Sequence, residues 1–171
     1  MKLSDVHITP YSTVLLDRDG TLNVHLVGDY VKRADELELI SGAPEAVAAM
    51  TKAGKHVYII TNQRGIGKGL MTENDLAAIH RRMLDAVEQA GGHINGIYYA
   101  TAVDKNDPQR KPQTGMWQQL LRDHPEVNPA TTLMIGDGDV DEAFARNCGI
   151  AFCRVDSLKK ENDRYTWHLA D

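Results

Sequence analysis

The chain has 171 residues, of which 42% are hydrophobic and 25% charged, a composition that predicts a single globular domain spanning residues 1–171. Its 19 basic and 24 acidic residues give a net charge of −5. Binding to a nucleic acid backbone needs clustered Lys and Arg, and no dense basic block occurs, so the charge argues against a nucleic acid partner. Small phosphorylated substrates remain compatible, because a metal ion and a few local cations can set the potential of a site.

The first residues lack the apolar stretch of a signal peptide, and no apolar run is long enough to span a membrane. We therefore expect a cytoplasmic protein without a membrane partner. The two cysteines, Cys148 and Cys153, have no metal-ligand spacing and suggest no disulfide framework. Both lie near apolar residues, which indicates a role in core packing.

Extended and helical patterns alternate along the chain, which is typical of a parallel sheet. The fold class predicted is α/β, a doubly wound, Rossmann-like parallel sheet with helices on both faces. The β-branched and apolar runs predict strands at 13–17, 56–61, 96–100, 131–136 and 150–154. Helical spacing of apolar residues predicts helices around 44–53, 73–90, 116–121 and 143–145.

The first strand ends in two carboxylates, Asp17 and Asp19, followed directly by Gly and Thr. Residues i and i+2 of an extended chain point to the same side, so both would face the region beyond the strand's carboxyl end, where open α/β sheets bind ligands. Two such carboxylates repel unless a cation lies between them or one is protonated. The alternative interpretation is an ordinary Asp-Gly turn.

The other predicted strands also lead into reactive side chains. The second strand ends in Thr61-Asn62-Gln63, Lys111 follows the loop after the third, and Asp137 follows the fourth. In a parallel sheet these ends lie along one edge, so the residues should meet. Carboxylates, a hydroxyl and a cation in one site are the parts that phosphoryl transfer requires.

The segment Asp17-Arg18-Asp19-Gly20-Thr21 resembles the first motif of the haloacid dehalogenase superfamily of phosphatases, and Thr61, Lys111 and Gly136-Asp137 with Asp141 resemble the second to fourth motifs. The resemblance covers residues 13 to 141. It implies a magnesium-dependent phosphomonoester hydrolase that acts through an aspartyl-phosphate. The spacing of the motifs leaves no room for a separate cap domain, so we expect only the loops 23–35, 63–70 and 101–109 to cover the site.

The resemblance also implies roles for the residues of these motifs. Asp17 would be the nucleophile, and Asp19 would be the general acid and base, which has to start protonated. Mg²⁺ would be bound by Asp17, Asp137 and the backbone carbonyl of Asp19, with Asp141 in support. The residues expected to bind the phosphate or the rest of the substrate are Thr61, Asn62, Gln63, Arg64, Arg110 and Lys111.

Longer stretches resemble two groups within the superfamily, the histidinol-phosphate phosphatases and the D-glycero-D-manno-heptose 1,7-bisphosphate phosphatases. Asp29-Tyr30-Val31 and Gly96-Ile97-Tyr98-Tyr99 are most similar to the heptose enzymes. Relatives in these groups usually carry a Cys/His zinc loop before the Arg-Lys-Pro motif, but residues 100–109 contain no Cys or His, so no zinc is expected. Gly138 stands where the heptose enzymes carry a lysine.

Two alternatives remain beside a sugar phosphatase and a histidinol-phosphate phosphatase. The segments Gly65-Ile66-Gly67-Lys68-Gly69 and 110–117 also resemble polynucleotide 3′-phosphatases. A phospho-accepting receiver domain would be a signalling protein, but its acceptor follows the third strand, and 96–100 supplies no Asp. Among the histidines, His80 is expected to pack on a helix face and His25 is the one candidate for the site. Trp167, in the polar tail after Asp156, is expected to pack on the body.

Overall fold

The computed structural model describes residues 8–155, 160–161 and 164–165, and its centre is a five-stranded sheet. All neighbouring strands of this sheet are parallel, and β1 lies in the middle of the order β3-β2-β1-β4-β5. The predicted parallel α/β sheet is confirmed. Its strands are β1 Thr13–Leu16, β2 His56–Asn62, β3 Gly96–Ala100, β4 Thr132–Gly136 and β5 Ala151–Arg154.

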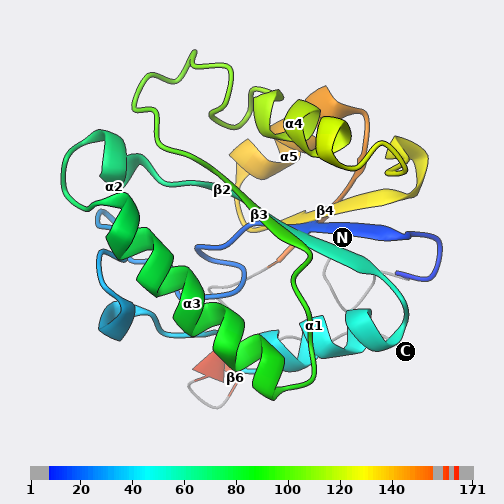
Figure 1. The fold of residues 1–171 in the computed structure, drawn as a ribbon, viewed down its shortest axis with the longest axis horizontal. Helices are drawn as coiled ribbons and strands as arrows, with labels where there is room; N and C mark the ends of the chain where they lie inside the picture. The colour runs from blue at the N-terminus through cyan, green and yellow to red at the C-terminus, as the bar shows by residue number, and fades with distance from the viewer. Residues whose placement is uncertain (1–7, 156–159, 162–163, 166–171) are drawn as a thin grey trace.

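Helices cover both faces of the sheet, as predicted: α1 and α3 lie on one side, and α4 and α5 on the other (Figure 1). The α-helices are α1 Ala43–Lys52, α2 Arg64–Gly67, α3 Glu73–Gln89, α4 Gly115–Asp123 and α5 Asp139–Cys148. Two 3₁₀ turns, η2 Ala34–Glu36 and η3 Pro129–Thr131, complete the description of this part of the chain.

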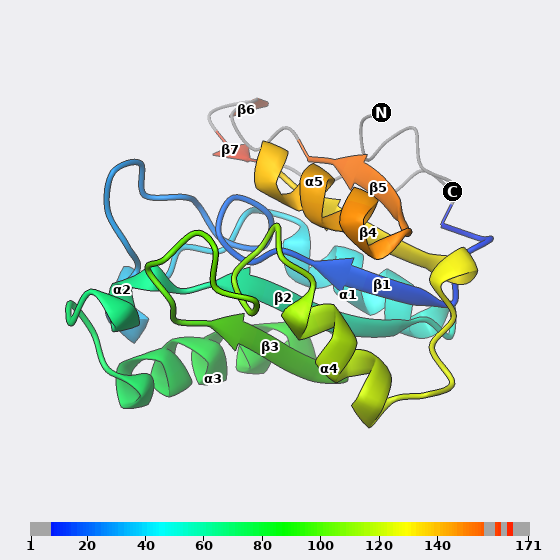
Figure 2. The ribbon, with the colours of Figure 1, turned by 90° about the horizontal axis from the view of Figure 1, so that it is seen from above.

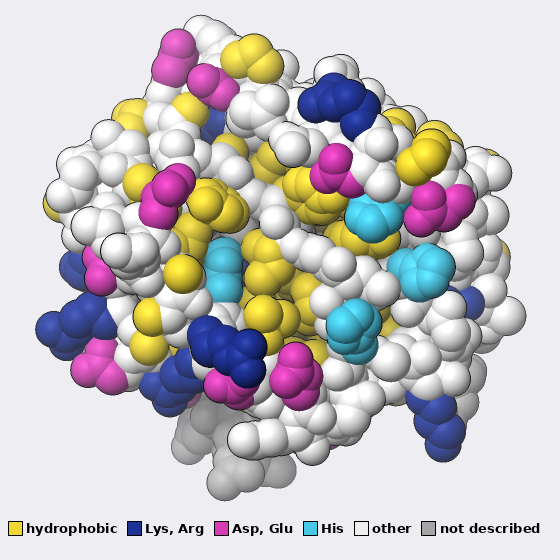
Figure 3. All heavy atoms as spheres, viewed as in Figure 1, with side chains coloured by type: hydrophobic (Ala, Val, Ile, Leu, Met, Phe, Trp, Pro, Cys, Tyr) yellow, Lys and Arg dark blue, Asp and Glu magenta, His cyan; other side chains and the backbone are white. Residues whose placement is uncertain are grey.

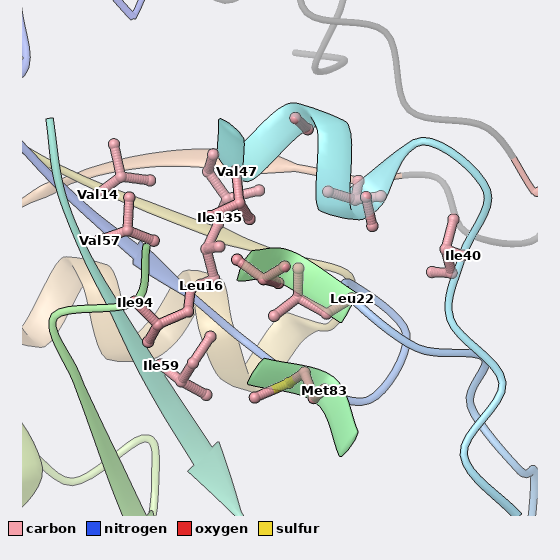
Figure 4. Close-up of a cluster of buried hydrophobic side chains, with 14 of the residues drawn as sticks. Val14, Leu16, Leu22, Ile40, Val47, Val57, Ile59, Met83, Ile94 and Ile135 are labelled. Atoms are coloured by element: carbon pink, nitrogen blue, oxygen red, sulfur yellow. The ribbon is translucent and has the colours of Figure 1, made fainter. Parts of the chain in front are cut away.

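Each face of the sheet has its own hydrophobic core, because alternate residues of a strand point to opposite faces. On the first face, Leu16 and Ile59 pack with Val47 of α1 and Met83 of α3 (Figure 4). The second core is built from side chains that include Leu15, Ile60, Met134, Trp117 and Phe144. The central strand β1 is therefore fully buried, which fixes the position of the residues that follow it.

Local signals in the sequence place the ends of α3 correctly. The Thr72 hydroxyl accepts a hydrogen bond from the Asp75 amide, and the Asp75 carboxylate accepts one from the Thr72 amide. This capping box satisfies two amide groups that the first helical turn leaves without partners. On its inner side α3 carries His80, buried as expected for helix-face packing.

Other elements differ from the prediction. Residues 64–67, expected in a loop, form the helix α2, and α5 extends well beyond the predicted 143–145. In the tail, β6 Lys160–Glu161 pairs with β7 Arg164–Tyr165 in an antiparallel ladder that the sequence did not indicate. Trp167 lies outside the described residues. Cys148 and Cys153 are free thiols packed on the two cores, as predicted.

The chain segments that leave β1, β2 and β3 gather at the carboxyl ends of the strands (Figure 2). They consist of loops and short helices, and within residues 8–155 no second folded unit interrupts them. Among the described residues, no helix is long and apolar enough to cross a membrane. The active-site candidates of the sequence therefore lie at one edge of a rigid sheet.

Candidate active site

Lys111 lies at the centre of the site at this edge and links three of its segments by hydrogen bonds. Its Nζ donates hydrogen bonds to Asp17 Oδ1 at 2.9 Å, to Asp141 Oδ1 at 2.6 Å and to the Ile60 carbonyl at 2.9 Å. The side chain is buried. Burial opposes the charge, but the carboxylates of Asp141 and Asp17 outweigh it and raise the pKa of Lys111, so the lysine remains a cation.

Three carboxylates surround this cation. One oxygen each from Asp17, Asp137 and Asp141 lies within 4.8 Å of the others. Burial and then the charge of Asp141 raise the pKa of Asp17 well above its usual range. Burial and Asp141 likewise raise the pKa of Asp137. Since three clustered carboxylates repel one another, one lysine compensates them only in part, and the set offers the hard oxygen ligands that Mg²⁺ prefers.

Two glycines allow the carboxylates to approach this closely. A Cβ on Gly20 would lie 2.1 Å from Asp137 Oδ2, and Gly20 also has a φ of +84°, which disfavours other residues. A Cβ on Gly136 would lie 2.4 Å from Asp141 Oδ2. Any larger residue at Gly20 in the first motif or at Gly136 in the fourth would therefore collide with a carboxylate of the site.

Asp19 has very different surroundings. Its Oδ1 accepts hydrogen bonds from Arg18 at 2.7 Å and from Asn23 at 3.0 Å, and its Oδ2 accepts one from Gln63 at 2.9 Å. Burial tends to raise the pKa of Asp19, but the Arg18 charge and the three donors together lower it. These three donors, one of them the Arg18 cation, favour the charged form of Asp19, whereas the sequence led us to expect a carboxyl group that starts protonated.

The residues at the end of β2 support the site through hydrogen bonds. The Asn62 side chain makes a reciprocal pair of hydrogen bonds with the Lys111 backbone, at 3.1 and 2.9 Å, and so ties β2 to the segment that carries the lysine. The Thr61 hydroxyl is fully buried and accepts a hydrogen bond from Gln63 Nε2 at 2.9 Å. Thr61 does not line the pocket described next, whereas Asn62 and Gln63 do.

A pocket of about 530 Å³ opens above the carboxylates. Cationic side chains stand around it: Lys68 lies over the Tyr30 ring at 5.2 Å, and the Arg110 guanidinium donates to the Val103 carbonyl of the loop 101–109. His25 Nδ1 lies 3.9 Å from Asp137 Oδ2. The predicted residues that line the pocket are Asp17, Asp19, Asn62, Gln63, Arg64, Arg110, Lys111, Asp137 and Asp141.

Sequence reasoning missed three residues that support the aspartates of the site. Arg18 and Asn23 bind Asp19; the only signal was that Arg18 lies inside the first motif and Asn23 two residues after it. Arg154 donates to the Asp137 carbonyl at 3.2 Å and to the exposed carboxylate of Asp139 at 2.8 Å. Nothing in the sequence indicated that the end of β5 would reach the residue that follows β4.

Comparison with known proteins places the chain in a family. A family model described as polynucleotide kinase 3 phosphatase matches residues 13–157. A D-glycero-beta-D-manno-heptose-1,7-bisphosphate 7-phosphatase of Neisseria meningitidis serogroup A is 38% identical over 125 residues, covering 72% of this chain and 66% of that protein. A D-glycero-alpha-D-manno-heptose-1,7-bisphosphate 7-phosphatase of Mycobacterium bovis is 32% identical over 139 residues, covering 81% and 73%. The match thus spans about two thirds of the length of the Neisseria relative.

Solved structures agree with this placement. The D,D-heptose 1,7-bisphosphate phosphatase of B. bronchiseptica, complexed with magnesium and phosphate, has a TM-score of 0.78 and 33% identity, covering 82% of this chain and 78% of that one. The D,D-heptose 1,7-bisphosphate phosphatase of Burkholderia thailandensis has a TM-score of 0.59 and 30% identity, covering 81% and 74%.

The fold is that of the haloacid dehalogenase superfamily of phosphatases. Within it, the chain belongs to the family described as polynucleotide kinase 3 phosphatase, whose model matches most of its length, and its relatives include heptose bisphosphate phosphatases.

Proposed function

We propose that this chain is a magnesium-dependent phosphomonoester hydrolase that acts through an aspartyl-phosphate on Asp17, within a single domain of residues 1–171. The observation that carries the proposal is the position of Asp17: it lies at the pocket floor, with Lys111 Nζ 2.9 Å from one of its oxygens and Asp19 two residues away. Nucleophile, cation and acid/base group thus face one pocket, as covalent phosphoryl transfer requires.

The donor set fits magnesium. Carboxylate oxygens of Asp17 and Asp137, with the backbone carbonyl of Asp19, are hard ligands, and Asp141 supports them by holding Lys111. When bound, magnesium supplies positive charge to the phosphoryl oxygens and to the crowded carboxylates. Its presence would also favour the ionised form of Asp17, which burial disfavours.

The residues themselves then carry out two half-reactions. An Asp17 oxygen attacks phosphorus while the bond to the ester oxygen breaks, and Asp19 gives its proton to that oxygen. In the second half, Asp19 takes a proton from water, which attacks phosphorus and releases Asp17 and phosphate. Asp19 takes its first proton from solvent as the anionic phosphoryl group arrives, because a neighbouring negative charge raises a carboxyl pKa.

The substrate we propose is a sugar phosphate such as D-glycero-D-manno-heptose 1,7-bisphosphate. The names of the relatives support this choice. A second phosphate on the substrate would find Arg64, Lys68 and Arg110 around the same pocket. A pocket of about 530 Å³ has the size of a small-molecule site.

A polynucleotide 3′-phosphate is the second candidate, supported by the description of the matching family model. The net charge of −5 argues against it. On the face shown in Figure 3, Lys and Arg side chains lie scattered among Asp and Glu and form no stripe. Such a surface gives a nucleic acid backbone little to bind.

One assay separates these substrates. Heptose 1,7-bisphosphate, histidinol phosphate, a 3′-phosphorylated oligonucleotide and p-nitrophenyl phosphate are compared at equal Mg²⁺. We expect kcat/KM for the heptose bisphosphate to exceed the others by at least about tenfold, since polar contacts to one substrate are left unpaired by another. A rate highest on the oligonucleotide would transfer the assignment to the second candidate. Equal rates on all four would refute the sugar assignment but not the phosphatase.

Zinc forms a separate test. We propose that the loop 100–109, which has neither Cys nor His, binds no zinc. Elemental analysis of the purified protein should find no stoichiometric zinc, and EDTA should abolish an activity that Mg²⁺ restores. Stoichiometric zinc would contradict this proposal.

A further inference from the structure

Arg18 occupies an unusual position for an arginine, since its side chain is completely buried. It stands between Asp17 and Asp19, and its guanidinium reaches two partners from different parts of the chain. One terminal nitrogen donates to Asp19 Oδ1 at 2.7 Å, and the other lies 3.3 Å from His80 Nε2 on α3. Burying a charge is costly unless it is paired and hydrogen-bonded, so the partners of Arg18 are what keeps it in this position.

His80 contacts the guanidinium nitrogen of Arg18 that does not bind Asp19. An arginine can only donate, so His80 Nε2 has to accept, which requires a neutral ring with its proton on Nδ1. Burial and the Arg18 charge lower the pKa of His80 to about 3, in agreement with a neutral ring. The ring also packs edge-on against Tyr99 of β3, with centroids 6.3 Å apart. Through His80, Arg18 is therefore connected to α3 and to Tyr99 of β3.

The hydrogen bonds distinguish the two oxygens of Asp19. Oδ1 accepts from both Arg18 and Asn23, which uses its two lone pairs. Among the residues that the structure describes, Oδ2 accepts a hydrogen bond only from Gln63, at 2.9 Å, and Asp19 lines the pocket. Only Oδ2 retains a lone pair for a proton in transfer.

We propose that Arg18 and His80 form a bracket that fixes the Asp19 carboxylate so that Oδ2 is its proton-transferring atom. Arg18 is a positioning residue that acts through Asp19, and His80 positions Arg18. The proposal rests on the proposed function, in which Asp19 protonates the leaving oxygen. It adds two residues to the site and assigns the proton to one named atom.

The bracket predicts how activity depends on the leaving group. An alkyl phosphate needs a proton on its leaving oxygen, whereas p-nitrophenolate is stable enough to leave without one. Misplacing Asp19 should therefore harm the alkyl substrate selectively. General acid catalysis contributes about 10²- to 10⁴-fold, which bounds the selective loss.

The experiment compares kcat/KM on a primary alkyl phosphate and on p-nitrophenyl phosphate. Arg18→Lys keeps the charge but cannot span both partners with a planar fork. We expect a loss of about 30-fold or more on the alkyl phosphate and less than about threefold on p-nitrophenyl phosphate, within the range that acid catalysis supplies. The exposed Arg81→Lys on the same helix as His80 is the matched control and should change neither rate.

A second pair of variants decides the question if Arg18→Lys folds poorly. His80→Leu removes the acceptor, whereas the side-chain oxygen of His80→Gln can still accept from Arg18. The selective loss should appear in His80→Leu and be at least partly rescued in His80→Gln, with the exposed His93→Gln as control.

Equal losses on the two substrates, or no difference between His80→Leu and His80→Gln, would overturn the bracket and leave the phosphatase assignment standing. A failure of the proposed function looks different: the wild-type protein would hydrolyse neither substrate, or Asp17→Asn would remain active.

Discussion

Asp17 and Asp19 are two residues apart on one strand extension, yet the fold gives them opposite surroundings. Asp17 faces two other carboxylates and a buried lysine, and burial raises its pKa. Asp19 faces an arginine and two amides, which together lower its pKa despite burial. The difference shows that a motif specifies which groups are present, whereas the segments packed around them decide the charge each group prefers.

The comparison also separates two ways of stabilising an anion. The donors of Asp19 include Arg18 and Asn23, both close to it in sequence. The cation of Asp17 is Lys111, 94 residues away, and the carboxylate cluster retains excess negative charge. The carboxylates around Asp17 can therefore accept a further cation, whereas the charge of Asp19 is already neutralised by Arg18. Four experiments test this contrast.

The largest effect should come from Asp17→Asn. An amide has no anionic oxygen to attack phosphorus, so we expect turnover to fall by about 10⁴-fold or more. Circular dichroism should show an unchanged fold, because Asn is nearly isosteric. A variant that keeps a tenth of the wild-type rate would disprove the covalent mechanism.

The next largest effect is a loss of folding stability when Lys111, the cation that contacts Asp17, is replaced. Lys111→Met leaves Asp17 and Asp141 buried without their partner, so the free energy of unfolding should fall by about 3–5 kcal/mol. Urea titration measures it, with Lys32→Met as a control expected to change little, because Lys32 is only half-buried and its ion-pair partner Asp29 is exposed.

A companion variant isolates the carboxylate repulsion. Adding Asp141→Asn to Lys111→Met removes one of the two uncompensated charges and should recover part of the lost stability. If the double variant is no more stable than the single one, repulsion within the cluster is not the cause.

Magnesium should stabilise the folded protein by compensating the same carboxylates. At a concentration about 100 times its Kd, a ligand of the folded state adds about 2.7 kcal/mol, visible as a higher Tm. Asp137→Asn should greatly reduce this shift, whereas Asn in place of the exposed Asp139 should preserve it. An equal shift in all three proteins would contradict the proposed ligand set.

The smallest effect is a loss of folding stability at low pH, caused by His80, which contacts the Arg18 partner of Asp19. His80 is neutral when folded, with a pKa of about 3, but titrates near 6.5 when unfolded. Below pH 6.5 the unfolded chain therefore binds the extra proton, and stability is lost as the pH falls towards 3, by about 2 kcal/mol between pH 6.5 and 5. In EDTA, urea titrations at these two values should show a smaller loss for His80→Gln, which has no titrating ring. Identical losses would mean that His80 is not kept neutral.

Most of the framework could be predicted because it depends on local patterns. The five strands and the division into two cores follow from the alternation and spacing of apolar residues. The capping box follows from Thr72 and the acidic Asp75 three residues later. That Asp17, Lys111 and Asp137 would meet also followed, because parallel strands end at a common edge. The helix α2 was missed, since its four residues contain two glycines and too few positions to show a period.

The sequence alone determined the membership of the site: which carboxylates, which lysine and which glycines stand at the strand ends. Only the tertiary structure decided what each of them does there. It buried Thr61 and left it out of the residues that line the pocket, buried Arg18 against a helix 62 residues further along the chain, and lowered the pKa of Asp19 where a protonated acid was expected. The physical reason is that charge and orientation depend on burial and on neighbours within a few ångströms, and those neighbours come from segments that no local pattern connects.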